Sequence, residues 1–129
     1  GASERIHFLC GDLFSPLGLG PRTDQNQADI IVTNPPYVPS GCLTALQPEV
    51  RDHEPELALA AGPRGTEIAE RIIAAAPSHL RDNGVLIMEM GIGQAKVLSR
   101  HFDATGEFHT PGIVKDLAGI ERVIQARKK

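Results

Sequence analysis

The apolar positions of the chain fall into short continuous runs and into helical repeats, with turn-forming residues between them. The run Asp29–Thr33 reads as a short strand buried on both faces, and Val85–Met90 reads as a second buried strand after the turn signal Asp82–Gly84. Strands that are apolar on both faces are typical of a parallel sheet covered by helices. The pattern therefore predicts an α/β fold.

Two helices are predicted after the first of these strands. Apolar residues recur at helical spacing over Thr66–Ala76, with charged residues on the other side, so this helix is expected to pack one stripe on the sheet. Pro77 is expected either to end or to bend it, because proline lacks a backbone donor and clashes with the preceding turn. A second helix is expected over Gln94–Phe102.

Strands are also predicted near both ends of the chain. Ile6–Cys10 is short and mostly apolar and is followed by a glycine, so it is expected to be a strand. Ile113–Val114 and Val123–Ala126 are strand-like and are joined through a glycine turn, which predicts an antiparallel hairpin at one sheet edge. The basic tail Arg127–Lys129 is expected to be solvated.

Two stretches lack a clear period. Ser15–Gln27 combines prolines, glycines and polar residues and is predicted to be a surface loop. Val38–Gly65 is long and rich in proline, and a structureless loop of that length in a compact domain is usually functional or a sign that an element has been misread. Its charged cluster Glu49–Glu54 could grip a protein substrate or form a local ion-pair network, and residue types alone favour the network. His53 is not assigned as a general base, because a histidine without a known partner is more often structural.

The residues Asn34-Pro35-Pro36-Tyr37 follow the first buried strand, at the end where α/β proteins place their functional groups. The prolines fix their own φ angles and keep Asn34 extended, so the turn is stiff. It can present the Asn34 side-chain carbonyl and the Pro35 backbone carbonyl as two acceptors beside the flat Tyr37 ring. Because this arrangement suits a planar NH2 group, the four residues are the candidate catalytic site.

This motif resembles that of the class I, S-adenosylmethionine-dependent methyltransferases that methylate a nitrogen on a planar amide or amine. Further stretches are similar to the HemK-type (PrmC) release factor glutamine methyltransferases. They are Leu46–Pro55, Ala58–Gly62, Lys115–Gly119 and Arg122–Val123. The resemblance runs from about Ile6 to the C-terminus, and the combination is far more specific than the tetrapeptide alone.

The resemblance implies a Rossmann-like class I methyltransferase sheet with helices on the faces and a terminal antiparallel hairpin. Residues 1–129 match only its C-terminal half, since the family's N-terminal helical domain and glycine-rich cofactor motif have no counterpart here. The chain is therefore expected to be the C-terminal portion of a catalytic domain. Without two strands of the full sheet, the strand before Asn34 would keep an open edge through which copies could associate.

The resemblance also implies roles for individual residues. Asp12 and Leu13 match positions beside the cofactor's adenine, and Asn34 is counted with them as cofactor-binding; from residue type alone, Asp12 would be a turn or helix cap. The implied substrate is the glutamine in the Gly-Gly-Gln loop of peptide-chain release factors. The implied methyl donor is S-adenosylmethionine, with no metal, although this chain alone is expected to bind the donor weakly or not at all.

Composition also limits the kinds of binding partner and the cellular compartment that are expected for the protein. The formal net charge of -3 gives no basic face of the kind that a duplex-DNA binder needs, so no DNA partner is expected. Cys10 and Cys42 have neither metal nor redox spacing and are expected to be free thiols in a reducing compartment. No apolar stretch approaches the roughly 20 residues of a membrane span, so a cytoplasmic protein without a membrane partner is expected.

Three other functions stay open at this point. A ribosomal-protein glutamine methyltransferase shares the motif, although Lys115–Gly119 argues against it. A nucleic-acid adenine N6 methyltransferase would stack a flipped base on Tyr37, and the lack of a basic surface disfavours it. The chain could also be a non-catalytic module that keeps the release-factor surface and has lost the cofactor.

Overall fold

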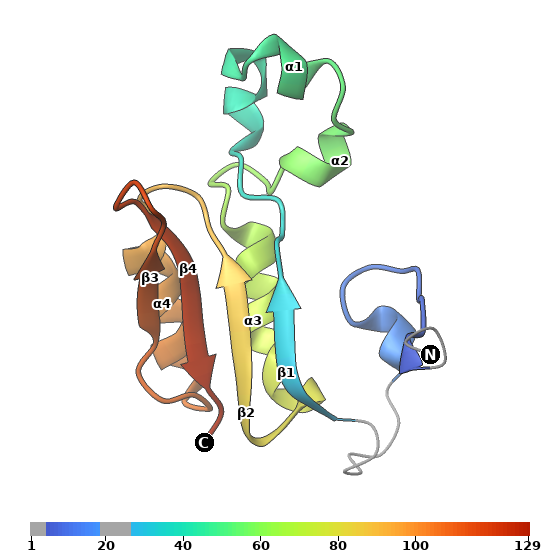
Figure 1. Cartoon of the computed structure of the whole chain (residues 1–129), viewed down its shortest axis with the longest axis vertical. Coiled ribbons are helices and arrows are strands. Elements are labelled where there is room, and N and C mark those ends of the chain that lie inside the picture. Colours follow the sequence, from blue (N-terminus) through green and yellow to red (C-terminus); the bar gives the residue numbers. More distant parts are fainter. Residues whose placement is uncertain (1–4, 19–26) are drawn as a thin grey trace.

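The computed structural model describes residues 5–18 and 27–129. Its centre is a four-stranded sheet in the order β1-β2-β4-β3 (Figure 1). Strands β1 and β2 run parallel, whereas β4 pairs antiparallel with both β2 and β3. The strands are β1 Ala28–Thr33, β2 Leu80–Glu89, β3 Gly112–Lys115 and β4 Glu121–Arg127. The predicted α/β fold with a terminal antiparallel hairpin is confirmed.

Two helices, α3 Glu67–His79 and α4 Ala95–Thr105, lie on the same face of the sheet (Figure 1). Both predicted helices are therefore confirmed, and Pro77 lies buried within the last turn of α3. Helices and strands meet in one apolar core whose largest fully buried side chains are Phe102, Ile73, Leu80, Leu86, Met88, Met90, Leu98 and Ile124.

The two faces of β1 differ in burial, which corrects the prediction of a strand buried on both faces. Ile31 packs against the core, whereas Ile30 is 57% exposed and Val32 is 72% exposed. Successive side chains of a strand point to opposite faces. Because α3 and α4 cover only one face, no helix among the described residues covers Ile30 and Val32.

The segment Ile6–Cys10 is not a strand, contrary to prediction. Its residues are exposed and have no partner strand in the described part of the chain. A strand is held by hydrogen bonds to a neighbouring strand, so an apolar run without such a neighbour cannot form one. The chain after it forms a short 3-10 helix, η2 Ser15–Leu17, and the Phe14 ring stacks on His79 of α3 at a centroid distance of 4.5 Å. Most of the predicted loop Ser15–Gln27 lies outside the described residues.

The predicted turn Asp82–Gly84 lies inside β2 as an irregularity of the strand. The register of the β1–β2 pair shifts between Ala28 and Ile30, where the extra residues of β2 are accommodated. Asn83 has a φ of 65°, in the left-handed region that asparagine tolerates better than most residues. The turn signal was therefore correct locally, although the pairing with β1 continues around it.

The C-terminal tail is anchored, which corrects the prediction that it is solvated for Lys128, whereas Arg127 and Lys129 are exposed as predicted. Lys128 is only 7% exposed; its Nζ donates to the Leu80 carbonyl at 2.8 Å and its backbone N–H donates to the Gly84 carbonyl at 2.8 Å. The Lys129 backbone N–H donates to the Glu107 carbonyl at 2.9 Å. These bonds fasten the end of β4 to neighbouring segments.

The predicted long loop Val38–Gly65 contains three short helices. They are η3 Ser40–Ala45, α1 Pro48–Arg51 and α2 Glu56–Leu59. Together they stand beyond the carboxyl ends of β1 and β2 (Figure 1). Helices this short show no measurable period in sequence, which is why the pattern indicated only a loop.

Candidate active site

The motif Asn34–Tyr37 continues directly from the carboxyl end of β1, between the sheet and the short helices (Figure 1). Asn34 is exposed, Pro35 is buried, and Pro36 and Tyr37 are half-buried. The buried proline anchors the turn, while the side chain before it stays open to a ligand. The edge where neighbouring parallel strands end is also where α/β sheets bind their ligands.

Backbone hydrogen bonds fix the chain as it leaves the motif. The Val38 N–H donates to the Leu59 carbonyl at 3.0 Å, and the Ala61 N–H donates to the Val38 carbonyl at 3.0 Å. The Ser40 N–H donates to the Gly62 carbonyl at 2.9 Å. The end of the motif is therefore tied to the segment that follows α2.

All four motif residues line one cavity of about 580 Å³, here called the motif cavity. Its volume lies within the usual range of small-molecule pockets. The other lining residues are Val38, Leu46, Glu54, Ala58 and Leu59. The structure thus brings together the residues that the sequence marked as catalytic, and adds a wall from the loop after η3 and from α2.

Glu54 is a candidate functional residue that sequence reasoning did not single out. It contributes the one carboxylate among the residues lining the motif cavity, and within the described residues it forms neither a hydrogen bond nor an ion pair. Its sequence signal was only its membership of the charged cluster Glu49–Glu54. Of the ion pairs expected there, the described residues make one, Arg51 with Asp52 at 2.7 Å.

Tyr37 also borders a second cavity, of about 530 Å³, on the α4 side of the motif. Polar residues from three separate segments line it, namely Arg64 and Thr66 before and at the start of α3, Gln94 before α4, and Arg122 on β4. Tyr37 therefore lies between the two cavities. Sequence reasoning gave no indication of the second cavity, because its lining residues are far apart in the chain.

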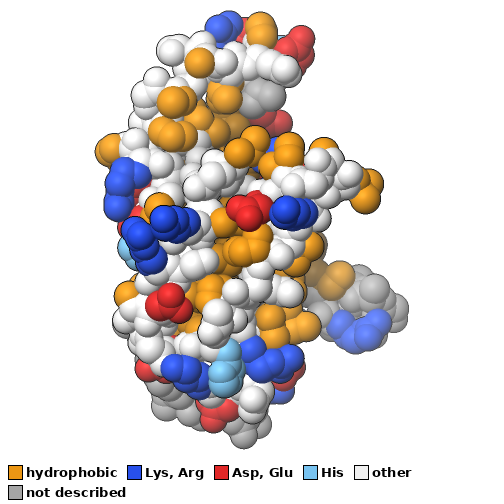
Figure 2. Space-filling view, turned by 90° about the vertical axis from the view of Figure 1, so that its left-hand side faces the viewer, with side chains coloured by type: hydrophobic (Ala, Val, Ile, Leu, Met, Phe, Trp, Pro, Cys, Tyr) orange, Lys and Arg blue, Asp and Glu red, His pale blue; other side chains and the backbone are white. Residues whose placement is uncertain are grey.

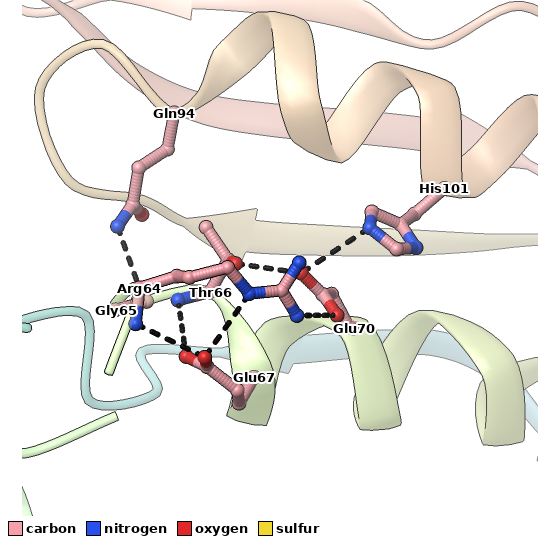
Figure 3. A network of polar contacts seen from close by, with 7 residues as sticks. All are labelled: Arg64, Gly65, Thr66, Glu67, Glu70, Gln94 and His101. Atoms are coloured by element: carbon pink, nitrogen blue, oxygen red, sulfur yellow. Dashed lines mark hydrogen bonds and ion pairs between the residues drawn. The ribbon is translucent and has the colours of Figure 1, made fainter. Parts of the chain in front are cut away.

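A polar network surrounds the start of α3 (Figure 3). The Arg64 guanidinium contacts Glu67 at 3.2 Å and Glu70 at 2.8 Å. The buried Thr66 hydroxyl donates to Glu70 at 2.6 Å, and the His101 ring nitrogen of α4 lies 3.2 Å from the same carboxylate. The network therefore joins the loop beside the motif to both long helices.

The Glu67 carboxylate caps the backbone at the beginning of α3. It accepts the Arg64 N–H at 3.0 Å and the Thr66 N–H at 3.1 Å. Desolvation, the largest single effect, would raise the pKa of Glu67, but these backbone donors and the Arg64 side chain outweigh it and lower the pKa to about 2. Glu67 is therefore ionised over the whole physiological range and is a structural group.

Asp12 and Leu13, expected beside the cofactor's adenine, lie apart from the motif cavity. The Asp12 carboxylate pairs with Arg71 of α3 at 2.5 Å, and Leu13 packs against the core with a φ of 50°. Neither is among the residues that line the motif cavity. Their role in cofactor binding remains a prediction.

Other kinds of site receive no support from the described residues. They contain no group of three or more His, Cys, Asp or Glu side chains placed to hold a metal ion. No helix among them is long and apolar enough to span a membrane. Figure 2, which views the β3 and α4 side, shows basic side chains in separate groups with apolar ones between them, instead of one continuous basic surface. Cys10 and Cys42 are free, as predicted, and both are exposed.

Comparison with known proteins shows which proteins the chain is similar to. No family model matches the chain. The release factor glutamine methyltransferase of Geobacter sulfurreducens is 44% identical over 123 residues, 95% of this chain and 41% of that protein. The corresponding protein of Gloeobacter violaceus is 40% identical over 124 residues, 96% of this chain and 41% of that protein. The chain is homologous to part of the release factor glutamine methyltransferases.

Two further proteins are similar to this chain, one in sequence and one in structure. A ribosomal protein uL3 glutamine methyltransferase of Burkholderia pseudomallei is 46% identical over 98 residues, 75% of this chain and 32% of that protein. The crystal structure of the protein-(glutamine-N5) methyltransferase (release factor-specific) of Alicyclobacillus acidocaldarius matches with a TM-score of 0.50 and 26% identity, covering 81% of this chain and 50% of that one. The methyltransferase fold class is thereby confirmed, and the chain spans about two fifths of the length of the curated relatives.

Proposed function

We propose that this chain provides the glutamine-binding part of a methyltransferase that transfers a methyl group from S-adenosylmethionine to the glutamine of the Gly-Gly-Gln loop in peptide-chain release factors. The observation that carries the proposal is the stiff turn Asn34–Tyr37 at the carboxyl end of β1, with all four residues lining one cavity. The names of the two release factor glutamine methyltransferases that match 95% and 96% of the chain support the same reaction and substrate. Such a substrate places the protein in the cytoplasm.

The residues of the motif can favour the reaction in three ways. An amide nitrogen is a weak nucleophile because its lone pair is delocalised into the carbonyl. The Asn34 side-chain carbonyl and the Pro35 carbonyl would accept its two N–H groups, which orients the nitrogen and stabilises the positive charge that develops on it. The Tyr37 ring would pack on the amide plane and exclude water. When bound, S-adenosylmethionine supplies a methyl group already activated by a cationic sulfur.

The described residues fit the methyl donor only in part. Leu13 offers an apolar contact for an adenine ring, and the Asp12 carboxylate is an acceptor for its amino group. That carboxylate is bonded to Arg71 at 2.5 Å, so it would have to share or exchange this partner. We assign none of the described residues to the ribose or to the methionine part of S-adenosylmethionine. We therefore expect this chain alone to bind S-adenosylmethionine weakly or not at all.

The proposal is tested by substrate binding, which does not require the donor. Tyr37 is the only tyrosine of the chain and there is no tryptophan, so intrinsic fluorescence reports on the motif alone. Titration with a peptide containing Gly-Gly-Gln is expected to change the Tyr37 emission. The matched peptide Gly-Gly-Glu has the same shape but no NH2 group, so it is expected to bind at least about 10-fold more weakly, the equivalent of one lost hydrogen bond. Equal affinity for the two peptides would contradict the proposal.

A second candidate substrate is the glutamine of ribosomal protein uL3, because a uL3 glutamine methyltransferase is 46% identical over three quarters of the chain. Both substrates present the same planar amide to Asn34. Parallel titrations with release factor and with uL3 distinguish them, since the correct protein is expected to bind more tightly than its isolated peptide. The release factor is favoured, because relatives with that name match 95% of the chain or more.

A further inference from the structure

Gln94 joins three segments of the chain through one side-chain amide. It is the residue before α4, and its Oε1 accepts the Gly91 N–H at 2.9 Å. Its Nε2 donates to the Tyr37 carbonyl at 3.0 Å and to the Gly65 carbonyl at 2.9 Å (the Gly65 bond is drawn in Figure 3). Both N–H groups of the amide are thus used to hold carbonyls from elements far apart in sequence.

The backbone around Gly65 is shaped to bring the two carbonyls together. Gly65 has a φ of 78°, which a residue with a side chain rarely adopts. A Cβ at this position would lie 2.7 Å from the Tyr37 carbonyl oxygen and 2.9 Å from a ring carbon of Pro39. Only glycine lets the loop before α3 come this close to the motif, and the close approach lets one NH2 group reach both carbonyls.

Gln94 lies outside the motif cavity. It lines the second cavity, and Tyr37 stands between the two. Residues after the motif are held by the Leu59–Gly62 segment, but the Tyr37 carbonyl itself is held by Gln94. Gln94 can therefore act on a bound amide only by setting the orientation of Tyr37.

We propose that Gln94 is a positioning residue of the glutamine site, which fixes the peptide plane after Tyr37 and through it the ring that packs on the substrate amide. The role rests on the function proposed above. A displacement of about 1 Å in a site of this kind can cost up to about 100-fold in rate, so the loss of one remote hydrogen bond is expected to be visible at the substrate.

The test uses Gln94→Asn, which separates positioning from fold stability. Asparagine keeps the side-chain amide and is among the preferred residues at the position before a helix, so this variant is expected to fold, with a melting temperature lowered only by the lost hydrogen bonds. Its side chain is shorter by one methylene group and cannot reach Gly91, Gly65 and Tyr37 together. We expect the affinity for the Gly-Gly-Gln peptide to fall by about 10-fold or more, and quenching of Tyr37 fluorescence by acrylamide to increase.

A second variant and a control complete the experiment. Gln94→Glu keeps the acceptor for Gly91 but places a carboxylate against two carbonyls, and it is expected to show a larger loss of peptide affinity. Gln125→Glu makes the same chemical change at an exposed position of β4 and is expected to bind the peptide like the wild type.

The possible outcomes are distinguishable. If the wild type does not bind the peptide, the proposed function is overturned and this role falls with it. If the wild type binds and both Gln94 variants bind equally well with unchanged quenching of Tyr37, the positioning role alone is overturned. The positioning role would also be overturned if, in both variants, the loss of peptide affinity were proportional to the drop in melting temperature. A purely structural role of Gln94 predicts this proportionality.

Discussion

At the scale of single residues, the motif combines a buried anchor with an open acceptor. Pro35 is buried at the end of β1, whereas the neighbouring Asn34 is exposed and lines the motif cavity. Rigidity and ligand contact are therefore assigned to different side chains. This separation makes Asn34 suitable for mutation, because changing it does not disturb the core.

The change Asn34→Ala is expected to weaken binding of the Gly-Gly-Gln peptide by about 10-fold or more, since it removes one of two acceptors for the amide. The melting temperature is expected to stay within about 2 °C of the wild type, because the side chain is exposed. Fluorescence titration and circular dichroism measure the two effects. Asn34→Asp keeps an acceptor of the same shape and is expected to retain more affinity than Asn34→Ala. Unaltered affinity of the alanine variant would remove Asn34 from the site.

The change Gly65→Ala is expected to lower the free energy of unfolding by about 2 kcal/mol or more, because it combines an unfavourable positive φ with a contact against the Tyr37 carbonyl. Gly93→Ala is the matched control: its φ is 81°, but nothing lies within 4 Å of the added carbon. The control is expected to cost only about 1 kcal/mol. Urea denaturation of both variants gives the difference, and equal losses would show that the contact with Tyr37 is unimportant.

At this scale the sequence indicated part of the candidate site. Asn34–Tyr37 were marked as candidates because they are contiguous and carry their chemistry in their residue types. Glu54 and Gln94 were not singled out, because the fold, and no local pattern, places them beside the motif. No pattern along the chain shows that one amide bonds two carbonyls that lie 29 and 57 residues away.

At the scale of elements, the start of α3 depends on charge. The Thr66 side chain makes no capping bond to the helix and instead donates to Glu70, while the Glu67 carboxylate takes the N–H groups of Arg64 and Thr66. An acid in the first turn also suits the helix dipole. The loop that contacts the motif is therefore held by an ionised side chain.

The lowered pKa of Glu67 predicts a specific loss of stability in acid. The ordinary pKa is 4.5 and the folded value is about 2, so the stabilisation is complete above about pH 4.5 and is lost as the pH falls toward 2. Glu67→Gln is expected to lower the melting temperature at pH 7. The difference between wild type and variant should shrink below pH 4.5 and disappear near pH 2, as thermal melts at several pH values would show. A difference that did not change with pH would contradict this assignment.

Helices and strands with a periodic apolar pattern were predicted well. Segments whose structure depends on a neighbouring strand or helix were not. Both long helices and the terminal hairpin follow from local patterns, since their apolar residues recur at the spacing of the element. Ile6–Cys10 has the composition of a strand, but the described chain offers it no neighbour to pair with. The predicted burial of β1 on both faces was wrong for a related reason, because Ile30 and Val32 face a side of the sheet on which none of the described helices lies.

At the scale of the whole molecule, the described helices cover one face of the sheet and leave the other open. Within the described residues, β1 lies at the end of the strand order with β2 as its single partner, so the backbone groups of its outer edge are available for pairing. The edge and the open face adjoin at Ile30 and Val32. Together they make an apolar surface with unpaired backbone groups, which is the combination that favours association between copies.

We predict that the isolated chain self-associates through this edge at high concentration. Val32→Lys is expected to reduce association, because a charged side chain on an exposed edge strand disfavours pairing. Leu117→Lys, in the fully exposed turn before β4, is the control and is expected to have no effect. Light scattering over a range of concentrations measures the change. Equal association of both variants would exclude the β1 edge as the contact.

The fastening of the last two residues has a practical consequence for labelling. Lys128 and Lys129 bond to the carbonyls of Leu80, Gly84, Gly106 and Glu107, so they belong to the fold and are not a free tail. Removing residues 128 and 129 would leave these carbonyls without their partners. A dye attached to Lys128 or Lys129 would disrupt these hydrogen bonds. The exposed Cys10 thiol is an attachment point that disturbs none of them.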